Sequence, residues 1–569
     1  MDTLLRDIRY GVRSLLKRRS LTLLAIVTLA LGIGANTAMF SVINAVIFRP
    51  LPFVEPDRLV WMNESGPEVA NRWLSYPNFL DWRARSKSFE AMSPFRGWSV
   101  TLTGTDQPVN LNARLVAPDY FRVMRVGPFM GRVFSADDDT PGANPVVVLS
   151  HGFWQSQFAS DKDIVGKAIT LDDRAYTVIG VMPESFTHQG PPPLWMPVGA
   201  QNWNQRDVRI AGNVIGRLKP GVSVEQARAE MNAIAQQLAR EYPVENAGAN
   251  RANVVSLQDS ITGNVKPALY ILFGAVGLVL LIACANVANL LLARAATRRK
   301  EFAVRAALGA SRGRIVRQLL AESLVLSLAG GVVGLLLASW SMALLARVAH
   351  ETIPRLESLH LSYRVLGFNL AISLLSGLAF GMAPALRFSK AQLQEALKDS
   401  GATTSEREGK RLRSALVIAE VALSVALLAG AGLLIKSMLR LANTEVGFQP
   451  QNVLTMDLKI SRSRYRGKGE LARLLQQILD RVQSQPEVES ATLCASLPGF
   501  GGGWTNDIFP EGQSPLNPGE MINVDWAIVS ADYFKTMRIP ILKGRTFTKD
   551  EDSQGKPVVL IDENLARRF

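Results

Sequence analysis

Five long apolar blocks, separated by polar stretches, most strongly constrain what this chain can fold into. A helix that crosses a membrane needs about 20 consecutive, mostly apolar residues. The blocks that meet this requirement are Leu21–Phe48, Ala268–Ala293, Leu319–Ala346, Leu366–Leu386 and Ala415–Leu439. They predict an α-helical integral membrane protein with five spans, and the polar stretches between them predict separate folded regions.

The first block needs to be distinguished from a cleavable signal peptide, because two arginines precede it and small residues interrupt it. A signal peptide has a shorter apolar core, followed by a polar mature chain. Here the apolar residues resume after Asn36 and continue to Phe48. This pattern favours a retained membrane anchor.

The basic residues predict how the chain is oriented. The net charge is +14, which can indicate a nucleic-acid or an anionic lipid partner. The basic residues cluster at the ends of the apolar blocks, within 6–19, 294–317 and 387–413, as the positive-inside rule expects of cytoplasmic segments. No soluble basic module suggests nucleic-acid binding. The N-terminus is therefore expected in the cytoplasm, and both large polar regions in the periplasm.

The resulting organisation has seven parts. They are a cytoplasmic amphipathic N-terminus (1–20), a first span (21–48), a periplasmic region (49–267), a three-span region (268–400) with its cytoplasmic segment (294–318), a cytoplasmic linker (401–414), a fifth span (415–439) and a second periplasmic region (442–569).

The two periplasmic regions share a motif in the same register. Val116–Val126 resembles Val529–Ile539, and a Gly-Arg-x-Phe sequence follows at the same spacing in both, beginning at Gly131 and Gly544. An acidic turn comes next in each, followed by apolar residues that predict strands at Pro145–Leu149 and Pro557–Ile561. A shared register over some thirty residues indicates a tandem duplication. The second copy is expected to be incomplete, because its counterpart continues much further.

Both periplasmic regions are predicted to be α+β. β-branched residues between Gly, Asp and Pro predict strands at Val146–Leu149, Ala168–Leu171 and Tyr176–Val181. Apolar residues at helical spacing predict amphipathic helices at Val224–Tyr242 and Leu471–Val482.

Four segments carry a family resemblance. They are Arg298–Arg312 (RRKEFAVRAALGASR), Ile315–Ser323 (IVRQLLAES), Arg9–Lys17 (RYGVRSLLK), and the stretch from Asp119-Tyr-Phe121 to Gly131-Arg132. With the order of one span, a large periplasmic domain and three spans, they resemble the MacB/FtsX-type ABC transporter permeases. The duplication resembles the subgroup of duplicated orphan permeases. The resemblance implies a MacB-like periplasmic core and FtsX-like transmembrane helices.

The resemblance also implies a function, partners and a location. The expected role is a permease subunit in a bacterial inner membrane that couples the cycle of a separate ABC ATPase to conformational change in the periplasm. Export or efflux of an unnamed substrate, contact with membrane lipid and with a periplasmic protein, and a pseudo-dimer in the full-length protein would follow. Two alternatives stay open: a non-transporting regulator that activates a periplasmic partner, and an ATP-independent scaffold.

The candidate ATPase-coupling site lies between the second and third spans. A short helix there would dock on the ATPase, and Gly309 allows a turn before the third span. The alternative is a solvated basic loop that only sets the topology. The candidate coupling residues are Glu301, Phe302, Arg305, Leu308, Gly309 and Arg312.

Enzyme chemistry is not predicted. The sequence contains no GxxxxGK[ST] phosphate-binding motif, so ATP hydrolysis is assigned to a partner. The four histidines are scattered, the two cysteines form no metal-binding pattern, and the acidic turns lack the ligand spacing of a calcium loop. No catalytic residue, metal or cofactor is therefore expected.

Polar residues inside the spans are further candidates. Glu420 is predicted as the acidic residue within a span, acting either as a proton or conformational switch or in an interfacial ion pair. Amides and glycines within spans commonly pack helices together. The residues assigned to packing are Asn36, Asn44, Asn286, Asn289, Gly274, Gly277, Gly330, Gly331 and Gly334.

Overall fold

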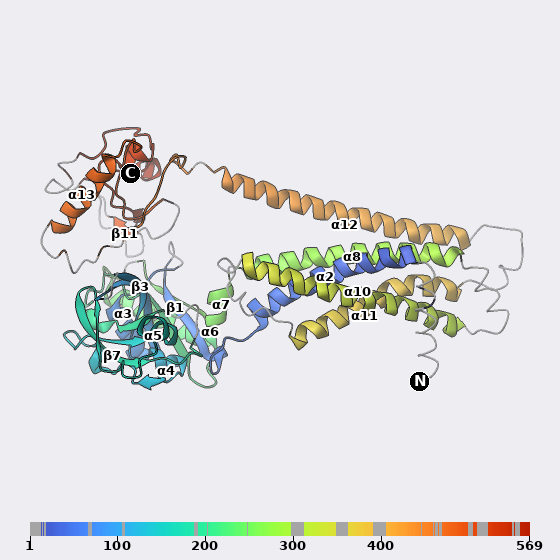
Figure 1. The fold of residues 1–569 in the computed structure, drawn as a ribbon, viewed down its shortest axis with the longest axis horizontal. Helices are drawn as coiled ribbons and strands as arrows, with labels where there is room; N and C mark the ends of the chain where they lie inside the picture. The colour runs from blue at the N-terminus through green and yellow to red at the C-terminus, as the bar shows by residue number, and fades with distance from the viewer. Residues whose placement is uncertain are drawn as a thin grey trace, which may run out of the picture. The chain divides into compact units, whose positions relative to one another are not determined.

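The chain forms two compact units in a computed structural model (Figure 1). One unit is Met1–Pro50 with Ile261–Asn443, and the other is Leu51–Ser260 with Thr444–Phe569. The structure describes residues 13, 15, 19–66, 71–104, 108–186, 192–201, 203–246, 248–263, 265–297, 312–348, 362–390, 405–444, 446–458, 460, 465, 469–498, 504–508, 522–548, 551 and 558–568.

The first unit is a bundle of long helices. They are α2 (Arg19–Ile43), α8 (Lys266–Thr297), α10 (Arg312–Val348), α11 (Tyr363–Lys390) and α12 (Ser405–Ala442), and the π-helical turn η1 (Asn44–Phe48) extends α2. Within the described residues, five helices are long and apolar enough to cross a membrane, and they coincide with the five predicted blocks. The predicted α-helical membrane region is confirmed.

The bundle helices differ in how far they are covered. α2, α10 and α11 pack closely, and α8 lies against α2 and α11. Helix α12 runs along α8 (Figure 1). No residue in the apolar window of α12 is buried, whereas 44% of the α2 window is. Helix α12 therefore presents almost its whole surface outward.

Residues 51–260 form an α+β domain around one mixed sheet. Its ten strands follow the order β10-β1-β9-β2-β3-β8-β5-β7-β4, and β6 pairs with both β2 and β7. The pairs β3–β8 and β5–β7 are parallel, and the others are antiparallel. The strands are β1 (Leu59–Ser65), β2 (Phe89–Thr103), β3 (Val109–Val116), β4 (Met130–Gly131), β5 (Val146–Leu149), β6 (Ala168–Leu171), β7 (Arg174–Val181), β8 (Leu194–Pro197), β9 (Asn213–Leu218) and β10 (Arg251–Ser256).

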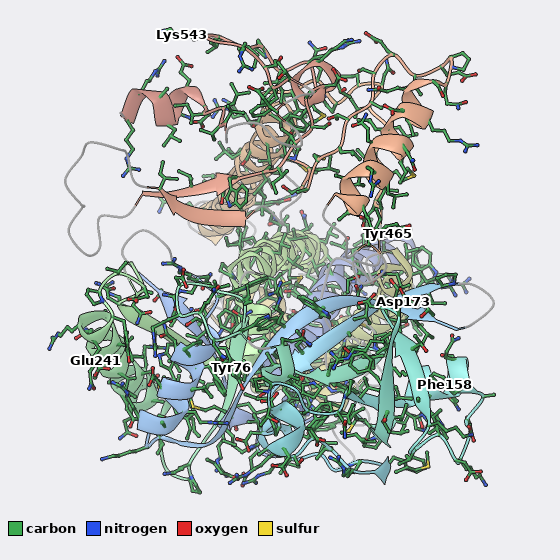
Figure 2. The ribbon with its side chains drawn as sticks, turned by 90° about the vertical axis from the view of Figure 1, so that its left-hand side faces the viewer. Tyr76, Phe158, Asp173, Glu241, Tyr465 and Lys543 are labelled. Carbon is green, nitrogen blue, oxygen red and sulfur yellow. The ribbon has the colours of Figure 1, made fainter. Side chains whose placement is uncertain are left out.

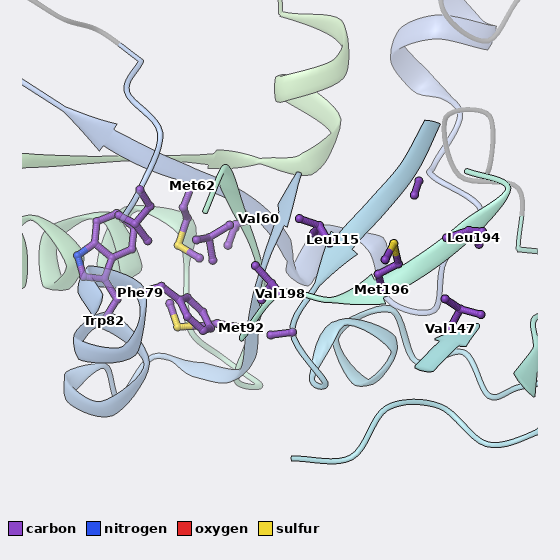
Figure 3. Close-up of a cluster of buried hydrophobic side chains, with 14 of the residues drawn as sticks. Val60, Met62, Phe79, Trp82, Met92, Leu115, Val147, Leu194, Met196 and Val198 are labelled. Carbon is purple, nitrogen blue, oxygen red and sulfur yellow. The ribbon is translucent and has the colours of Figure 1, made fainter. Parts of the chain in front are cut away.

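Short helices connect and cover these strands. They are η2 (Pro56–Arg58), α3 (Tyr76–Arg85), α4 (Tyr120–Met124), η3 (Asp137–Asp139), α5 (His151–Phe158), η4 (Gly199–Gln201), α6 (Val224–Glu241) and α7 (Leu257–Thr262). The apolar core lies where α3 and α6 meet the sheet, and Figure 3 shows Met62, Phe79, Trp82 and Met92 together in it. The β-rich α+β prediction is confirmed.

The local predictions in this domain also hold. β5 and β6 have the predicted bounds, and β7 begins two residues before the predicted Tyr176. Helix α6 ends at Glu241, one residue before the predicted end. Its start is fixed by a capping box, in which the side chains of Ser223 and Gln226 each accept a hydrogen bond from the other's backbone N–H.

Residues 444–569 contain fewer regular elements. Those described are α13 (Glu470–Gln483), a hairpin of β11 (Trp504–Ile508) and β12 (Ile522–Trp526), α14 (Tyr533–Thr536) and α15 (Glu563–Arg568). The predicted helix at Leu471–Val482 is confirmed. The predicted strand at Pro557–Ile561 is wrong, because its described part, 558–561, is not a strand. Its counterpart β5 pairs with β7 and β8, which come later in the chain.

Candidate coupling site

The predicted coupling segment is the part of the site that the structure does not describe. Glu301, Phe302, Arg305, Leu308 and Gly309 all lie outside the described residues. Arg312 is the first residue of α10, and only its backbone is described. The docking role of this segment stays a prediction. What the structure does place are the helices α8 and α10 that the segment connects.

Glu420 lies in α12 and is half-buried. Among the described residues it forms no ion pair, although Arg411 and Arg413 lie two turns earlier on the same helix and are exposed. Both predicted roles for Glu420, as a switch and as an interfacial pair, remain untested by this arrangement.

The prediction that Glu420 is the acid within the spans is wrong in one respect, because Glu322 also lies in the third span. Glu322 is 5% exposed in α10, and it accepts a hydrogen bond from Gln318 Nε2 at 3.3 Å. A buried carboxyl within a span is costly and marks a functional candidate. The signal was present in the sequence, since Glu322 falls inside the block Leu319–Ala346.

A polar seam connects the helices at the centre of the bundle. We define it as Asn36 and Thr37 on α2, Ser323, Ser327 and Gly331 on α10, and Asn369 and Ser373 on α11. Asn369 Nδ2 donates to Thr37 Oγ1 at 3.0 Å and to the Gly331 carbonyl oxygen at 3.3 Å. Asn36 Nδ2 donates to the carbonyl oxygen of Val276 on α8 at 2.9 Å. These bonds join four helices, so the packing role predicted for Asn36 is confirmed.

Small residues let these helices approach closely along the seam. A Cβ atom placed on Gly331 would lie 2.2 Å from Ser373 Oγ, and one on Gly377 would lie 2.3 Å from Ser327 Oγ. On the α2 side, a Cβ on Gly34 would lie 2.8 Å from the Gly334 carbonyl oxygen. At Gly34 the obstructing atoms are backbone, so a larger side chain there requires α2 and α10 to move apart, whereas at Gly331 and Gly377 the facing serine side chains must shift.

The five glycines predicted to pack helices divide into two groups, and the packing role of Asn286 and Asn289 stays a prediction. Gly330, Gly331 and Gly334 make close interhelical contacts, so their prediction is confirmed. The prediction is wrong for Gly274 and Gly277, because a Cβ on either would meet nothing within 4 Å. Both glycines lie on α8, a helix whose apolar window is only 17% buried, so much of its surface faces outward.

The exit of the first span has an irregular backbone. The helix ends in the π-helical turn η1, where Asn44 is buried and its Nδ2 lies 3.5 Å from Ser362 Oγ. Among the described residues, Asn44 Oδ1 accepts no hydrogen bond. Single π-helical turns are frequent at functional sites. This turn lies just before the segment that leads into the periplasmic domain.

The periplasmic domain has a tightly held charged interior. Glu64 is 2% exposed, and one of its carboxylate oxygens lies 3.1 Å from Arg209 Nε. Its other oxygen accepts a hydrogen bond from Asn78 Nδ2, which also donates to Asn246 Oδ1 at 2.7 Å. On the surface beside this network, Arg85 donates two hydrogen bonds to Glu241, at the end of α6 (Figure 2). Hydrogen-bonded networks of this kind make the interior of a domain rigid.

The first acidic turn binds side chains of the domain itself. Asp138 pairs with Arg132 and accepts hydrogen bonds from Ser135, and these bonds, chiefly the one from Arg132, lower its pKa to about 2. Asp139 accepts hydrogen bonds from Tyr76 Oη (3.1 Å; Figure 2) and from the Gly199 N–H (2.6 Å). Burial nevertheless raises the pKa of Asp139 to about 6.

Those carboxylates point to different partners, so they do not converge on one ion. No cluster of three metal-ligating side chains occurs anywhere in the part of the chain that the structure describes.

The fold defines a class: a multi-span membrane protein whose helix bundle carries a β-rich α+β domain. The family comparison makes this specific. A model described as the MacB-like periplasmic core domain matches residues 22–234 and, a second time, 414–569. A model described as the FtsX-like permease C-terminal region matches residues 273–393. The chain belongs to the family of MacB/FtsX-type ABC transporter permeases, and the two core-domain matches agree with the internal duplication.

Individual relatives agree at lower coverage. The macrolide export ATP-binding/permease protein MacB of Bdellovibrio bacteriovorus is 25% identical over 344 residues, which is 59% of this chain and 51% of that protein. Its namesake in Neisseria gonorrhoeae is 28% identical over 314 residues, covering 53% and 45%. The chain thus spans about half the length of these curated relatives. The solved periplasmic region of MacB from Actinobacillus actinomycetemcomitans is 16% identical, with a TM-score of 0.30 over 38% of this chain and 94% of that chain.

Proposed function

We propose that this chain is the permease subunit of an ABC-type system that converts the cycle of a cytoplasmic ATPase into conformational change in the periplasm. The observation that carries the proposal is the match of 273–393 to the FtsX-like permease region, joined in one chain to two matches to the MacB-like core. The FtsX-like match covers α8 from residue 273 onward, and the whole of α10 and α11. The segment between α8 and α10 is the proposed ATPase contact.

The ATPase is proposed to be a separate protein. The relatives' names describe them as ATP-binding as well as permease proteins, and this chain contains no phosphate-binding GxxxxGK[ST] motif. The permease role and an ATP-binding role would then be divided between two chains. We also propose that the chain lies in a bacterial inner membrane with its N-terminus in the cytoplasm. This orientation follows the positive-inside rule, because the basic segments would then face the cytoplasm.

The polar seam favours a mechanical role for the helix bundle rather than that of an open channel. The amide groups of Asn36 and Asn369 are used in hydrogen bonds between helices, and the glycines are used in close packing. Export or efflux would then be driven by movement of the periplasmic domains. A regulator that activates a periplasmic partner would use the same movement, so it is the second candidate.

Co-purification from membranes tests the proposal. The full chain is compared with a Glu301→Ala/Arg305→Ala variant and with a matched control, Arg298→Ala/Lys300→Ala, which also changes two charged residues of the segment. We expect an ATPase to co-purify with the wild type and the control but not with the first variant. Equal recovery in all three would refute the coupling segment, and failure to recover any ATPase would favour the ATP-independent scaffold.

A further inference from the structure

A forked contact ties the exit of the first span to the periplasmic domain. Residues 51–58 lead from that span into β1, and Glu55 lies in them. Arg125, at the end of α4, donates from Nη1 to Glu55 Oε2 at 2.6 Å and from Nη2 to Glu90 Oε2, on β2, at 3.1 Å. One guanidinium therefore bridges the exit segment and the sheet.

The same contact recurs in the second copy of the duplication. Gln449 follows the fifth span and precedes Pro450, as Glu55 follows the first span and precedes Pro56. Arg538 occupies the position of Arg125 in the repeated motif. It donates from Nη1 to Gln449 Oε1 at 3.4 Å and from Nη2 to Glu489 Oε2 at 3.3 Å. Two parts of the chain thus build one arrangement from different acceptor residues.

Both arginines hold an unfavourable backbone conformation. Arg125 has φ of +53° and Arg538 has φ of +52°. In this left-handed region glycine is the residue without a steric cost, and a long side chain there is strained. Strain that recurs in both copies indicates that the side chain is needed at this position. In both copies the arginine side chain makes the forked contact.

The first copy holds its exit segment with further bonds. Arg217 is fully buried, and it donates to the carbonyl oxygens of Val123 (2.7 Å) and Glu55 (3.3 Å). Arg58 adds an ion pair to Glu90 at 2.8 Å. In the second copy, by contrast, the Arg538 side chain is 55% exposed and that of Glu489 is 81% exposed. The first contact should therefore be the stronger, because exposed ion pairs contribute little.

We propose that Arg125 and Arg538 are positioning residues that fasten the exit segments of the first and fifth spans to their periplasmic domains. A fastened segment transmits movement of the span to the domain, whereas a loose one absorbs it. The inference rests on the proposed mechanical coupling for its purpose, but the fastening itself can be measured without any ATPase.

Hydrogen–deuterium exchange on the full chain in lipid nanodiscs tests the fastening. In Arg125→Gly, which removes the fork and also relieves the backbone strain, we expect amide exchange in residues 51–58 to rise about tenfold. Exchange in β5 and β7 should stay unchanged. The matched control is Arg122→Ala on the same helix, since the ion pair of Arg122 among the described residues is with Asp119, at 3.7 Å. Unchanged exchange in residues 51–58 of Arg125→Gly would overturn the proposal.

A conservative variant and a double-mutant cycle separate the contact from general stability. Arg125→Lys keeps the charge but loses the fork, so we expect an intermediate rise in exchange. Arg125→Ala and Glu55→Ala should each raise exchange, and the double variant should raise it by less than the two single effects combined, because both remove the same contact. Fully additive effects would count against the contact.

A second exchange experiment tests whether movement of the span is transmitted to the periplasmic domain. With the ATPase bound, nucleotide should change exchange in the wild-type periplasmic domain, and this response should be lost in Arg125→Gly while ATP hydrolysis continues. A retained response would refute transmission through Arg125. If no ATPase binds the wild type, the proposed function fails, yet the fastening result stands on its own.

Discussion

The two copies of the repeated motif share their local geometry but differ in their surroundings. Tyr120 and Phe121 form an edge-on ring pair at 5.5 Å and 85°, and Tyr533 and Phe534 form one at 5.4 Å and 89°. The salt bridge that follows is also repeated, from Arg132 to Asp138 and from Arg545 to Glu551. Residues close in sequence therefore suffice to specify the ring pair and the salt bridge of the repeated motif.

The surroundings differ because they come from distant parts of the chain. Phe121 is 2% exposed and packs edge-on against Trp195 of β8. Phe534 is half-buried, and other apolar residues of the second copy, such as Leu542 and Val559, are 70% and 81% exposed. The comparison teaches that the motif forms locally, whereas its burial depends on strands supplied later in the sequence.

Helices α2 and α12, the spans that precede the two copies, show the same contrast. Gly32 and Gly34 of α2 have the spacing of Gly430 and Gly432 of α12. A Cβ on Gly34 would meet the backbone of Gly334, but one on Gly432 would meet nothing within 4 Å. A similar helix pattern thus occupies a packed position in one copy and an open position in the other.

Removing the central ring of each motif should have the largest effect on this comparison. We expect Phe121→Ala to lower the free energy of unfolding of the first domain by about 3–5 kcal/mol, because a buried ring leaves a cavity. Phe534→Ala should cost about 1 kcal/mol, since its ring is already partly hydrated. Urea unfolding of the full chain in nanodiscs, followed by tryptophan fluorescence, measures both. Equal losses would show that the second copy has a core of its own.

The glycine contrast comes next in size. Gly34→Leu should destabilise the bundle by about 3 kcal/mol, because the side chain must push α2 away from α10. Gly432→Leu should change stability by less than about 0.5 kcal/mol, as expected at an open site. Thermal unfolding and size-exclusion profiles of the full chain in detergent give the readout. A large loss from Gly432→Leu would mean that α12 is covered in the purified protein.

These contrasts also show what could be predicted from sequence. The five spans, the strands β5 and β6, and the helix α6 follow from residues within each segment, so their patterns were sufficient. The duplication was visible because the register of Asp119-Tyr-Phe121 recurs in full at Asp532-Tyr-Phe534. The family resemblance followed from Arg298–Arg312 together with three other short segments.

Interactions between distant segments could not be predicted. The forked contact of Arg125 depends on Glu55 and Glu90, which are 70 and 35 residues away, and no local pattern indicates that they meet. The polar seam likewise depends on which face of α10 meets α11. The strand predicted at 557–561 shows the converse, because a suitable local pattern did not suffice to make residues 558–561 a strand. Glu322 differs from these long-range contacts, because its position within an apolar block could be read directly from the sequence.

The half-buried carboxyl of Asp139 should make the stability of the first domain depend on pH. Its raised pKa, about 6, means that the folded domain binds a proton more tightly than the unfolded chain does. Stability from this group is therefore present below about pH 4 and is lost as pH rises to about 6, by at most about 3 kcal/mol. We expect Asp139→Asn to flatten the profile between those values. Unfolding curves at pH 4 to 7.5 test this, and an unchanged profile would assign the dependence to another group.

The repeated salt bridge should give the smallest effect. Arg132→Ala should lower the stability of the first domain by at most about 1 kcal/mol, because the Arg132 side chain is 53% exposed. The partner's pKa of about 2 makes this contribution present above about pH 4 and lost as pH falls toward 2, opposite in direction to that of Asp139. Arg545→Ala in the second copy should change stability even less, because that pair lies in a region with little core. Unfolding of both variants at pH 7 and pH 3 measures the difference. If Arg545→Ala cost as much as Arg132→Ala, the local bridge would be holding the turn by itself, and burial by distant strands would matter less than the comparison of the two copies indicates.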